Sequence, residues 1–159
     1  MARTLTHHCK IALIDEEATL ALGDRLARCV TVPQVVFLRG ELGAGKTTLA
    51  RGLLRAAGVQ GTLRSPTYTL LEPYAAADQR LLHLDLYRLV DPEAVEYLGV
   101  RDYPPDSTVW LVEWPQRGLG HLPPADVVVP LQHDGPARLA ELEWPSGRVT
   151  FDQVTFDIK

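Results

Sequence analysis

One short stretch constrains this chain more than any other part of its 159 residues. Gly40, four further residues and then Gly45-Lys46-Thr47 match the phosphate-loop pattern G-x-x-x-x-G-K-[ST]. An apolar run, 35–39, precedes the loop, and leucines on one helical face follow it over 47–57. A strand that turns through glycines into a helix aims backbone N–H groups and the helix dipole at an anion. We therefore predict that this segment holds a phosphate chain, with Lys46 on the terminal phosphates and the Thr47 hydroxyl on Mg²⁺.

The rest of the chain predicts strands mixed with few helices. Asp15 is expected to cap a helix that runs to about Cys29, and Asp91 to cap a short helix that ends at Gly99. Segments within 67–89 follow one another too closely for crossover helices, so they should pair antiparallel. The predicted strands are 9–14, 35–39, 67–74, 80–89, 107–114, 127–133, 137–144 and 148–158, the last two joined by a turn at 145–147. The fold class is therefore α/β with a partly antiparallel sheet.

Size and composition exclude several kinds of protein. A chain of this length is expected to form one domain, 1–159, and a net charge of −4 disfavours a dedicated nucleic-acid binder. Cys9 and Cys29 offer no disulfide framework and fit a reducing cytosol. No apolar run approaches the ~20 residues of a membrane helix, and no signal peptide is apparent. We expect a cytoplasmic protein that does not contact the membrane.

Two acids are candidates for the metal site that a phosphate loop requires at the end of a neighbouring strand. Asp85 lies in an alternating strand, on the same face as His83 and Tyr87. Glu113 ends the very apolar strand that contains 109–112. An acid in that position either meets a cation or shifts its pKa. The alternative for both is a strand-end acid exposed to water.

Other residues near these acids allow two interpretations each. From the residues alone, Trp114 is more typical of a core side chain than of one that stacks on a base. Ser65-Pro66-Thr67 is more often a plain turn than a loop that senses a γ-phosphate. His83 is more typical of a hydrogen-bonded structural residue than of a catalytic base.

Taken together, GELGAGKTT, SPTYTLLEPY, HLDLYRL and VEWPQRG resemble, in order and spacing, the TsaE family. This family is the ATPase component of bacterial tRNA threonylcarbamoyladenosine synthesis. The likeness begins at DEEATLALGDRLA and weakens after about residue 130. It implies a small P-loop NTPase fold in which helices flank a mixed central sheet. It also implies a protein that binds ATP with Mg²⁺ and hydrolyses it slowly.

The resemblance further implies two protein partners. These are the subunit that transfers threonylcarbamoyl to adenosine 37 of tRNAs reading ANN codons and its paralogous scaffold subunit, of the TsaD and TsaB type. Nucleotide binding and hydrolysis would reset this complex between catalytic cycles, and tRNA would be contacted only through the complex. A nucleotide used as a conformational signal needs no second substrate pocket in the chain.

Carried over to this sequence, the family assigns the phosphates to the loop and the metal to a hydroxyl and two acids. Thr47 and Glu113 would ligate Mg²⁺, while Asp85 would hold the metal's water shell or orient the attacking water. Lys46 would act on the terminal phosphates. The residues that would cradle the phosphates are Gly43, Ala44, Gly45, Lys46, Thr47 and Thr48.

The resemblance also suggests residues around the rest of the nucleotide. Thr67 would act as a switch threonine near the γ-phosphate, and Trp114 and Gln116 would lie beside the nucleotide. Glu16 would lie on the adenine side, and a late basic residue such as Arg138 would also reach the nucleotide.

Three other functions share some of these features. A small-molecule or nucleoside kinase needs an acceptor pocket and a lid with arginines, for which only Arg101 and Arg117 are available. A GTP-driven switch protein is disfavoured because no N-K-x-D segment occurs. The third alternative is an adaptor that binds nucleotide without hydrolysing it.

Overall fold

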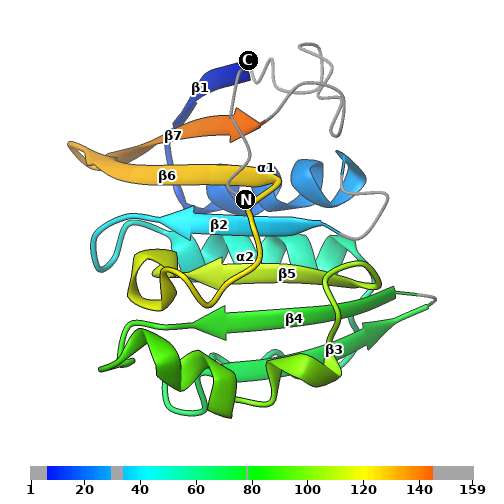
Figure 1. Ribbon diagram of the computed structural model, residues 1–159. Coiled ribbons are helices and arrows are strands. Elements are labelled where there is room, and N and C mark those ends of the chain that lie inside the picture. Colours follow the sequence, from blue (N-terminus) through cyan, green and yellow to red (C-terminus); the bar gives the residue numbers. More distant parts are fainter. Residues whose placement is uncertain (1–6, 30–33, 78, 145–159) are drawn as a thin grey trace.

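The computed structural model describes residues 7–29, 34–77 and 79–144, and its strands form one mixed sheet in the order β1-β7-β6-β2-β5-β4-β3 (Figure 1). The neighbours β6, β2, β5 and β4 run parallel, while β1–β7, β7–β6 and β4–β3 pair antiparallel. The strands are β1 (His7–Leu13), β2 (Val35–Arg39), β3 (Leu71–Ala76), β4 (Gln79–Asp85), β5 (Thr108–Glu113), β6 (Val127–Asp134) and β7 (Ala137–Trp144). The predicted α/β class with a partly antiparallel sheet is confirmed.

Helices cover both faces of the sheet. The two α-helices, α1 (Glu16–Cys29) and α2 (Lys46–Ala56), lie on one face, behind the sheet in Figure 1. Leu22, Leu49 and Leu53 from these helices are fully or almost fully buried in the core on that face. The other face is covered by loops and three 3-10 helices, η1 (Pro92–Tyr97), η2 (Val100–Asp102) and η3 (Pro115–Gly118). Among the described residues, no helix is long and apolar enough to cross a membrane.

The predicted helix caps are confirmed at both sites. The Asp15 side chain accepts a hydrogen bond from the Ala18 N–H at 2.8 Å, and Asp91 accepts one from the Glu93 N–H at 3.0 Å. The second of these helices is a 3-10 helix that ends at Tyr97, shorter than the predicted span to Gly99.

Two predicted strands are wrong in their bounds. Residues 66–69 form a turn, closed by the Leu70 N–H on the Pro66 carbonyl at 2.8 Å, so the strand begins only at Leu71. The next strand ends at Asp85 rather than Leu89. The Asp85 N–H bonds the Leu70 carbonyl at 3.0 Å, and a turn at 87–88 follows, closed by the Leu89 N–H on the Leu86 carbonyl at 3.0 Å. The predicted strand 148–158 and the turn at 145–147 lie outside the described residues.

The parallel strands bring the predicted site together at one edge. β5 lies between β2 and β4, and all three end on the same side of the sheet (left in Figure 1). The phosphate loop follows β2, Glu113 ends β5 and Asp85 ends β4, opposite Glu113 in the strand register. Sites of α/β proteins gather at the carboxyl ends of parallel strands because loops from several strands meet there.

Helices α1 and α2 touch backbone to backbone, which yields a prediction for stability. A Cβ on Gly23 would lie 2.4 Å from the Leu49 carbonyl oxygen, and one on Gly52 would lie 2.4 Å from that of Leu20. Gly23→Ala must therefore separate the helices, and we expect it to lower the free energy of unfolding by about 1–3 kcal/mol in urea denaturation. A helical Gly→Ala change without this clash gains up to about 1 kcal/mol, so a gain would contradict the prediction.

Candidate nucleotide-binding site

The phosphate loop is shaped by two glycines with different roles. Gly40 directly follows β2 with φ +148°, and a Cβ there would lie 2.4 Å from the Leu131 carbonyl oxygen of β6. Gly45 caps α2 with φ +105°, a conformation that L side chains rarely adopt. The first bond of α2 runs from the Leu49 N–H to the Gly45 carbonyl at 2.9 Å, so the N–H groups of residues 46–48 have no acceptor within the helix.

Lys46 lies almost buried at the base of this loop. Its Nζ donates to the carbonyls of Gly40 at 2.7 Å and Glu41 at 2.8 Å and lies 4.6 Å from the centre of the Trp114 ring. Burial lowers the pKa of Lys46, and the nearby carboxylates of Glu113, Asp85 and Glu41 oppose that shift. The ammonium group is thus held by neutral carbonyls and a ring face, which a phosphate oxygen can replace with a stronger charge-assisted bond.

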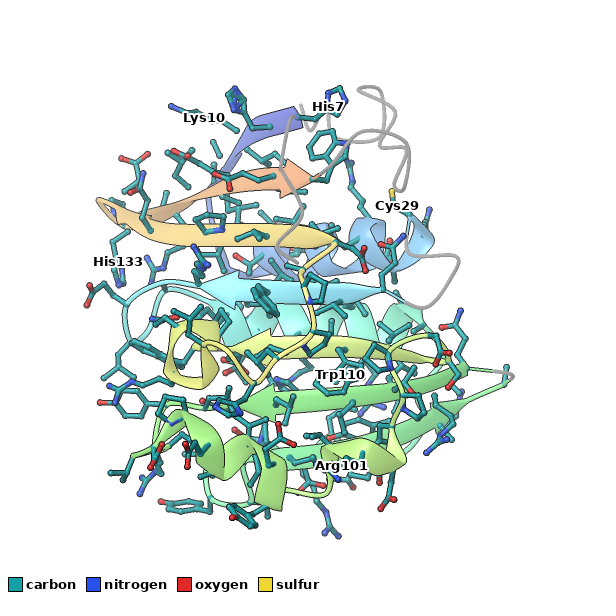
Figure 2. All side chains as sticks on the ribbon, in the orientation of Figure 1. His7, Lys10, Cys29, Arg101, Trp110 and His133 are labelled. Carbon is teal, nitrogen blue, oxygen red and sulfur yellow. The ribbon has the colours of Figure 1, made fainter. Side chains whose placement is uncertain are left out.

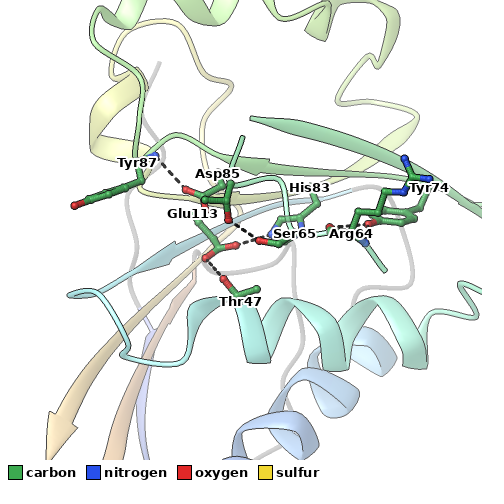
Figure 3. Close-up of polar contacts among 9 residues, drawn as sticks. Thr47, Arg64, Ser65, Tyr74, His83, Asp85, Tyr87 and Glu113 are labelled. Carbon is green, nitrogen blue, oxygen red and sulfur yellow. Dashed lines mark hydrogen bonds and ion pairs between the residues drawn. The ribbon is translucent and has the colours of Figure 1, made fainter. Parts of the chain in front are cut away.

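A chain of three side chains links the loop helix to two strands (Figure 3). The Thr47 hydroxyl donates to Glu113 Oε1 at 2.8 Å, and Glu113 Oε2 lies 2.7 Å from His83 Nε2. The side chains of His83 and Glu113 are 3% and 2% exposed. The predicted proximity of Thr47 and Glu113 is therefore present, and His83 is hydrogen-bonded as its structural interpretation required.

Asp85 lies next to this chain in a different environment. Its Oδ1 accepts the Tyr87 N–H at 3.1 Å, and the residue is 8% exposed. Burial raises the pKa of Asp85, and the neighbouring Glu113 carboxylate raises it further. The Tyr87 N–H, His83 and Lys46 act in the opposite direction.

A cavity of about 430 Å³ opens between the loop and the two acids. It brings together most of the predicted site residues: Gly43, Gly45, Lys46, Thr47, Thr48, Thr67, Asp85, Glu113 and Trp114. Leu42, Tyr87 and Arg88 also line it, although none of them was predicted as a site residue. The alternating pattern of HLDLYRL placed Tyr87 on the face of Asp85, whereas no sequence signal distinguished Arg88.

A second cavity of about 280 Å³ lies on the other side of the loop and shares Gly43, Gly45 and Thr48 with the first. Glu16 and Arg138, the two predicted residues most distant from the loop in sequence, both line it. The Arg138 guanidinium also donates to the Gly43 carbonyl at 3.1 Å.

Two predicted residues stand apart from the cavities. Gln116 is exposed on η3 and lines neither of them. Ala44 is buried, and its N–H bonds the Glu41 carbonyl at 3.1 Å within the loop itself. Their contact with a nucleotide stays a prediction.

Trp114 is half-buried: it packs against the core on the face of the sheet opposite α1 and α2, as the core interpretation required, and it also lines the larger cavity, so its stacking on a base stays a prediction. Its ring is tilted against Tyr87, with the ring centres 4.9 Å apart, and the Arg117 guanidinium carbon lies 5.9 Å from the centre of the Trp114 ring. Arg101, the other arginine considered for a kinase lid, pairs with Glu96 at 3.6 Å and lines neither cavity (Figure 2).

The sequence of 13–140 matches the family model of the threonylcarbamoyl adenosine biosynthesis protein TsaE. This chain belongs to the TsaE family. The tRNA threonylcarbamoyladenosine biosynthesis protein TsaE of Haemophilus influenzae is 50% identical over 108 residues, 68% of each chain. Its counterpart in Aquifex aeolicus is 34% identical over 125 residues, 77% of this chain and 86% of that one. The crystal structure of Bacillus subtilis YdiB is similar with a TM-score of 0.74 and 25% identity, covering 91% of this chain and 90% of that one.

The oxygen ligands of this TsaE-family site fit a magnesium ion. Mg²⁺ is commonly held by one or two carboxylates together with phosphate oxygens and water. Thr47, Glu113 and Asp85 supply a hydroxyl and two carboxylates beside the phosphate loop. In the described part of the chain, no group of three or more His, Cys, Asp or Glu side chains is placed to hold a metal alone. The hydroxyl and the two carboxylates fit an ion that also binds phosphate oxygens and water.

The raised pKa of Asp85 predicts that its ionised carboxylate destabilises the folded state of this TsaE-family protein. Asp85→Asn keeps an oxygen for the Tyr87 N–H and removes a buried charge beside Glu113. We expect the nucleotide-free, metal-free variant to gain about 1 kcal/mol at neutral pH, or about 2–4 °C in Tm.

The sign of this effect depends on pH. Because the folded state binds the Asp85 proton more tightly than the unfolded chain does, the ionised carboxyl destabilises the fold above its raised pKa. The advantage of the asparagine should shrink as pH falls through that pKa and vanish below about 3.9, where both states of Asp85 are neutral. Thermal melts of both proteins across pH measure this difference, and a less stable variant at neutral pH would contradict it.

Proposed function

We propose that this TsaE-family protein binds ATP with Mg²⁺ at the larger cavity and hydrolyses it slowly. The observation that carries this proposal is the 2.8 Å contact between the Thr47 hydroxyl and Glu113, beside Lys46 and the N-terminus of α2. The N–H groups of the loop and the Lys46 ammonium would bind the phosphates, and the Thr47 and Glu113 oxygens would hold the metal. When bound, Mg²⁺ would neutralise charge that develops on the phosphoryl oxygens.

The remaining cavity residues would orient the reaction. Asp85 would hold a water of the metal shell or orient the attacking water. Thr67, in the turn at 66–69, would contact the γ-phosphate through its hydroxyl, which in the structure bonds Ser65 Oγ at 2.7 Å. Trp114 would cover the phosphate side of the nucleotide, and Gln116 would approach it from η3.

The second cavity offers a place for the base of the nucleotide. Because both cavities share the loop residues Gly43, Gly45 and Thr48, one nucleotide can place its phosphates in the larger cavity and its base in the smaller. Glu16 and Arg138 would then lie on the adenine side of ATP.

The protein would act in the cytoplasm as part of a larger assembly. Its relatives from Haemophilus influenzae and Aquifex aeolicus are named for tRNA threonylcarbamoyladenosine biosynthesis, which supports a role in the same modification. We propose that it joins the threonylcarbamoyl transferase and its paralogous scaffold subunit, of the TsaD and TsaB type, and that ATP turnover resets them between cycles. The net charge of −4 supports contact with tRNA only through these partners.

Reconstitution tests this role. The two partner proteins, substrate tRNA and ATP are combined with or without this chain, and modified tRNA is counted per transferase. We expect many modifications with the chain and about one without it. The Lys46→Ala variant should behave as if no chain were added. Equal yields with and without the wild-type chain would refute the resetting role.

A further inference from the structure

His83 is buried in β4 and contacts the acid of the proposed metal site rather than the cavity. Its Nε2 lies 2.7 Å from Glu113 Oε2, and the two side chains are almost completely removed from solvent. His83 and Asp85 are two residues apart on one strand, so they lie on the same face of the sheet, and β4 pairs with β5 so that Asp85 is opposite Glu113. His83 therefore contacts the Glu113 carboxylate from a position two residues before the end of β4, on the side away from the carboxyl ends of the strands.

The hydrogen atoms in this chain can be assigned from the chemistry of its members. An ionised carboxylate only accepts hydrogen bonds, so His83 must donate from Nε2 and Thr47 must donate from its hydroxyl. The single hydroxyl proton of Thr47 is then committed to Glu113. The oxygen lone pairs of Thr47 are directed away from Glu113 and remain available to a cation.

The two acids are thus placed for different tasks. Both oxygens of Glu113 are occupied, one by Thr47 and the other by His83. Asp85 accepts the Tyr87 N–H through Oδ1, and within the described ranges no hydrogen-bond donor reaches its Oδ2. Asp85 lines the cavity and keeps an oxygen for a water molecule, whereas Glu113, beside contributing a metal-facing carboxylate, holds the Thr47 hydroxyl in a fixed orientation.

We infer that His83 is a positioning residue for the magnesium site: it holds one oxygen of Glu113 so that the other accepts the hydrogen bond of the Thr47 hydroxyl, which leaves the Thr47 lone pairs directed at the metal. This inference rests on the proposed binding of ATP with Mg²⁺. Without the His83 donor, a buried carboxylate oxygen loses its partner, and Glu113 must turn toward another donor or toward water. Partners of metal ligands typically change metal affinity by about 10–100-fold when they are removed.

The test compares nucleotide binding with and without the metal. ATP affinity is measured by calorimetry in excess EDTA and then across a Mg²⁺ titration for the wild type, His83→Leu and His83→Gln. In His83→Leu we expect the Mg²⁺ concentration at half-effect to rise about tenfold or more, with unchanged ATP affinity in EDTA. The glutamine side chain retains an N–H donor of similar reach, so His83→Gln should recover most of the wild-type response.

Two further variants separate positioning from general damage to the fold. Thr108→Val alters a fully buried side chain at the other end of the Glu113 strand and should leave both affinities unchanged. If His83→Leu does not fold, His83→Asn takes its place, because its shorter amide stays polar and falls short of Glu113.

The outcomes distinguish the inference from the proposed function. A wild-type Mg²⁺ response in His83→Leu, or in His83→Asn where that replaces it, overturns the role of His83 alone. A loss of ATP affinity that is equal in EDTA and in Mg²⁺ also overturns it. If the wild-type protein binds ATP with no response to Mg²⁺, the proposed function and this inference fail together.

Discussion

Replacing Lys46 with alanine is expected to weaken ATP binding by about 100-fold, which corresponds to about 2.7 kcal/mol. The ammonium group lies inside the loop and donates to two backbone carbonyls, so a phosphate chain would give it negatively charged acceptors in place of neutral ones. Burial already lowers the pKa of Lys46, and phosphate oxygens would stabilise the charged form of the ammonium. Calorimetric titration with ATP measures the loss.

A matched control separates this effect from a general loss of positive charge. Lys10 lies on β1, is largely exposed and pairs with Glu141 at 3.8 Å, so Lys10→Ala removes the same charge outside the site. It should leave ATP affinity unchanged. Wild-type affinity in Lys46→Ala would contradict the assignment of the loop.

Features that depend on neighbouring residues could be predicted from the sequence. The strand before the loop has the predicted bounds, Val35–Arg39, and α2 starts one residue before its predicted start at Thr47. The cap at Asp15 was also predicted, since it needs only a side chain three residues before its donor. For the acids, the phosphate-loop pattern predicted only that Asp85 or Glu113 would lie at a neighbouring strand end, and the resemblance to the TsaE family is what paired Glu113 with Thr47.

Contacts between distant segments that no motif signals could not be predicted. The predicted alternation continued to Leu89, but β4 ends at Asp85, whose N–H bonds the Leu70 carbonyl next to the turn at 66–69. The contact of His83 with Glu113 joins residues thirty positions apart, and no local pattern distinguishes a histidine paired in this way from one paired elsewhere. Arg88 was missed for the same reason, since only the turn after β4 brings it to the cavity wall.

Replacing Glu113 with glutamine is expected to lower Mg²⁺-dependent ATP hydrolysis by about 100-fold while ATP binding in EDTA is retained. The amide keeps the size of the side chain, so Glu113→Gln leaves no cavity in the buried strand. Glu113→Ala should lose the same activity but would also leave a cavity there. Glutamine removes the negative charge and offers one acceptor oxygen where the carboxylate offers two. It can therefore no longer accept from both Thr47 and His83, which lie on opposite oxygens.

The comparison of Lys46 and Glu113 variants tests the arrangement of the site more sharply than either alone. Loss of Lys46 removes a contact with the phosphates, so ATP affinity should fall whether or not Mg²⁺ is present. Loss of the Glu113 charge should affect only the metal-dependent step, measured as ADP released under saturating ATP. Glu141→Gln is the matched control, because Glu141 is partly exposed, pairs with Lys10 and lies outside the site. This variant should hydrolyse ATP at the wild-type rate. Full activity in Glu113→Gln would contradict this arrangement, because it would show that the metal-dependent step does not need the Glu113 charge.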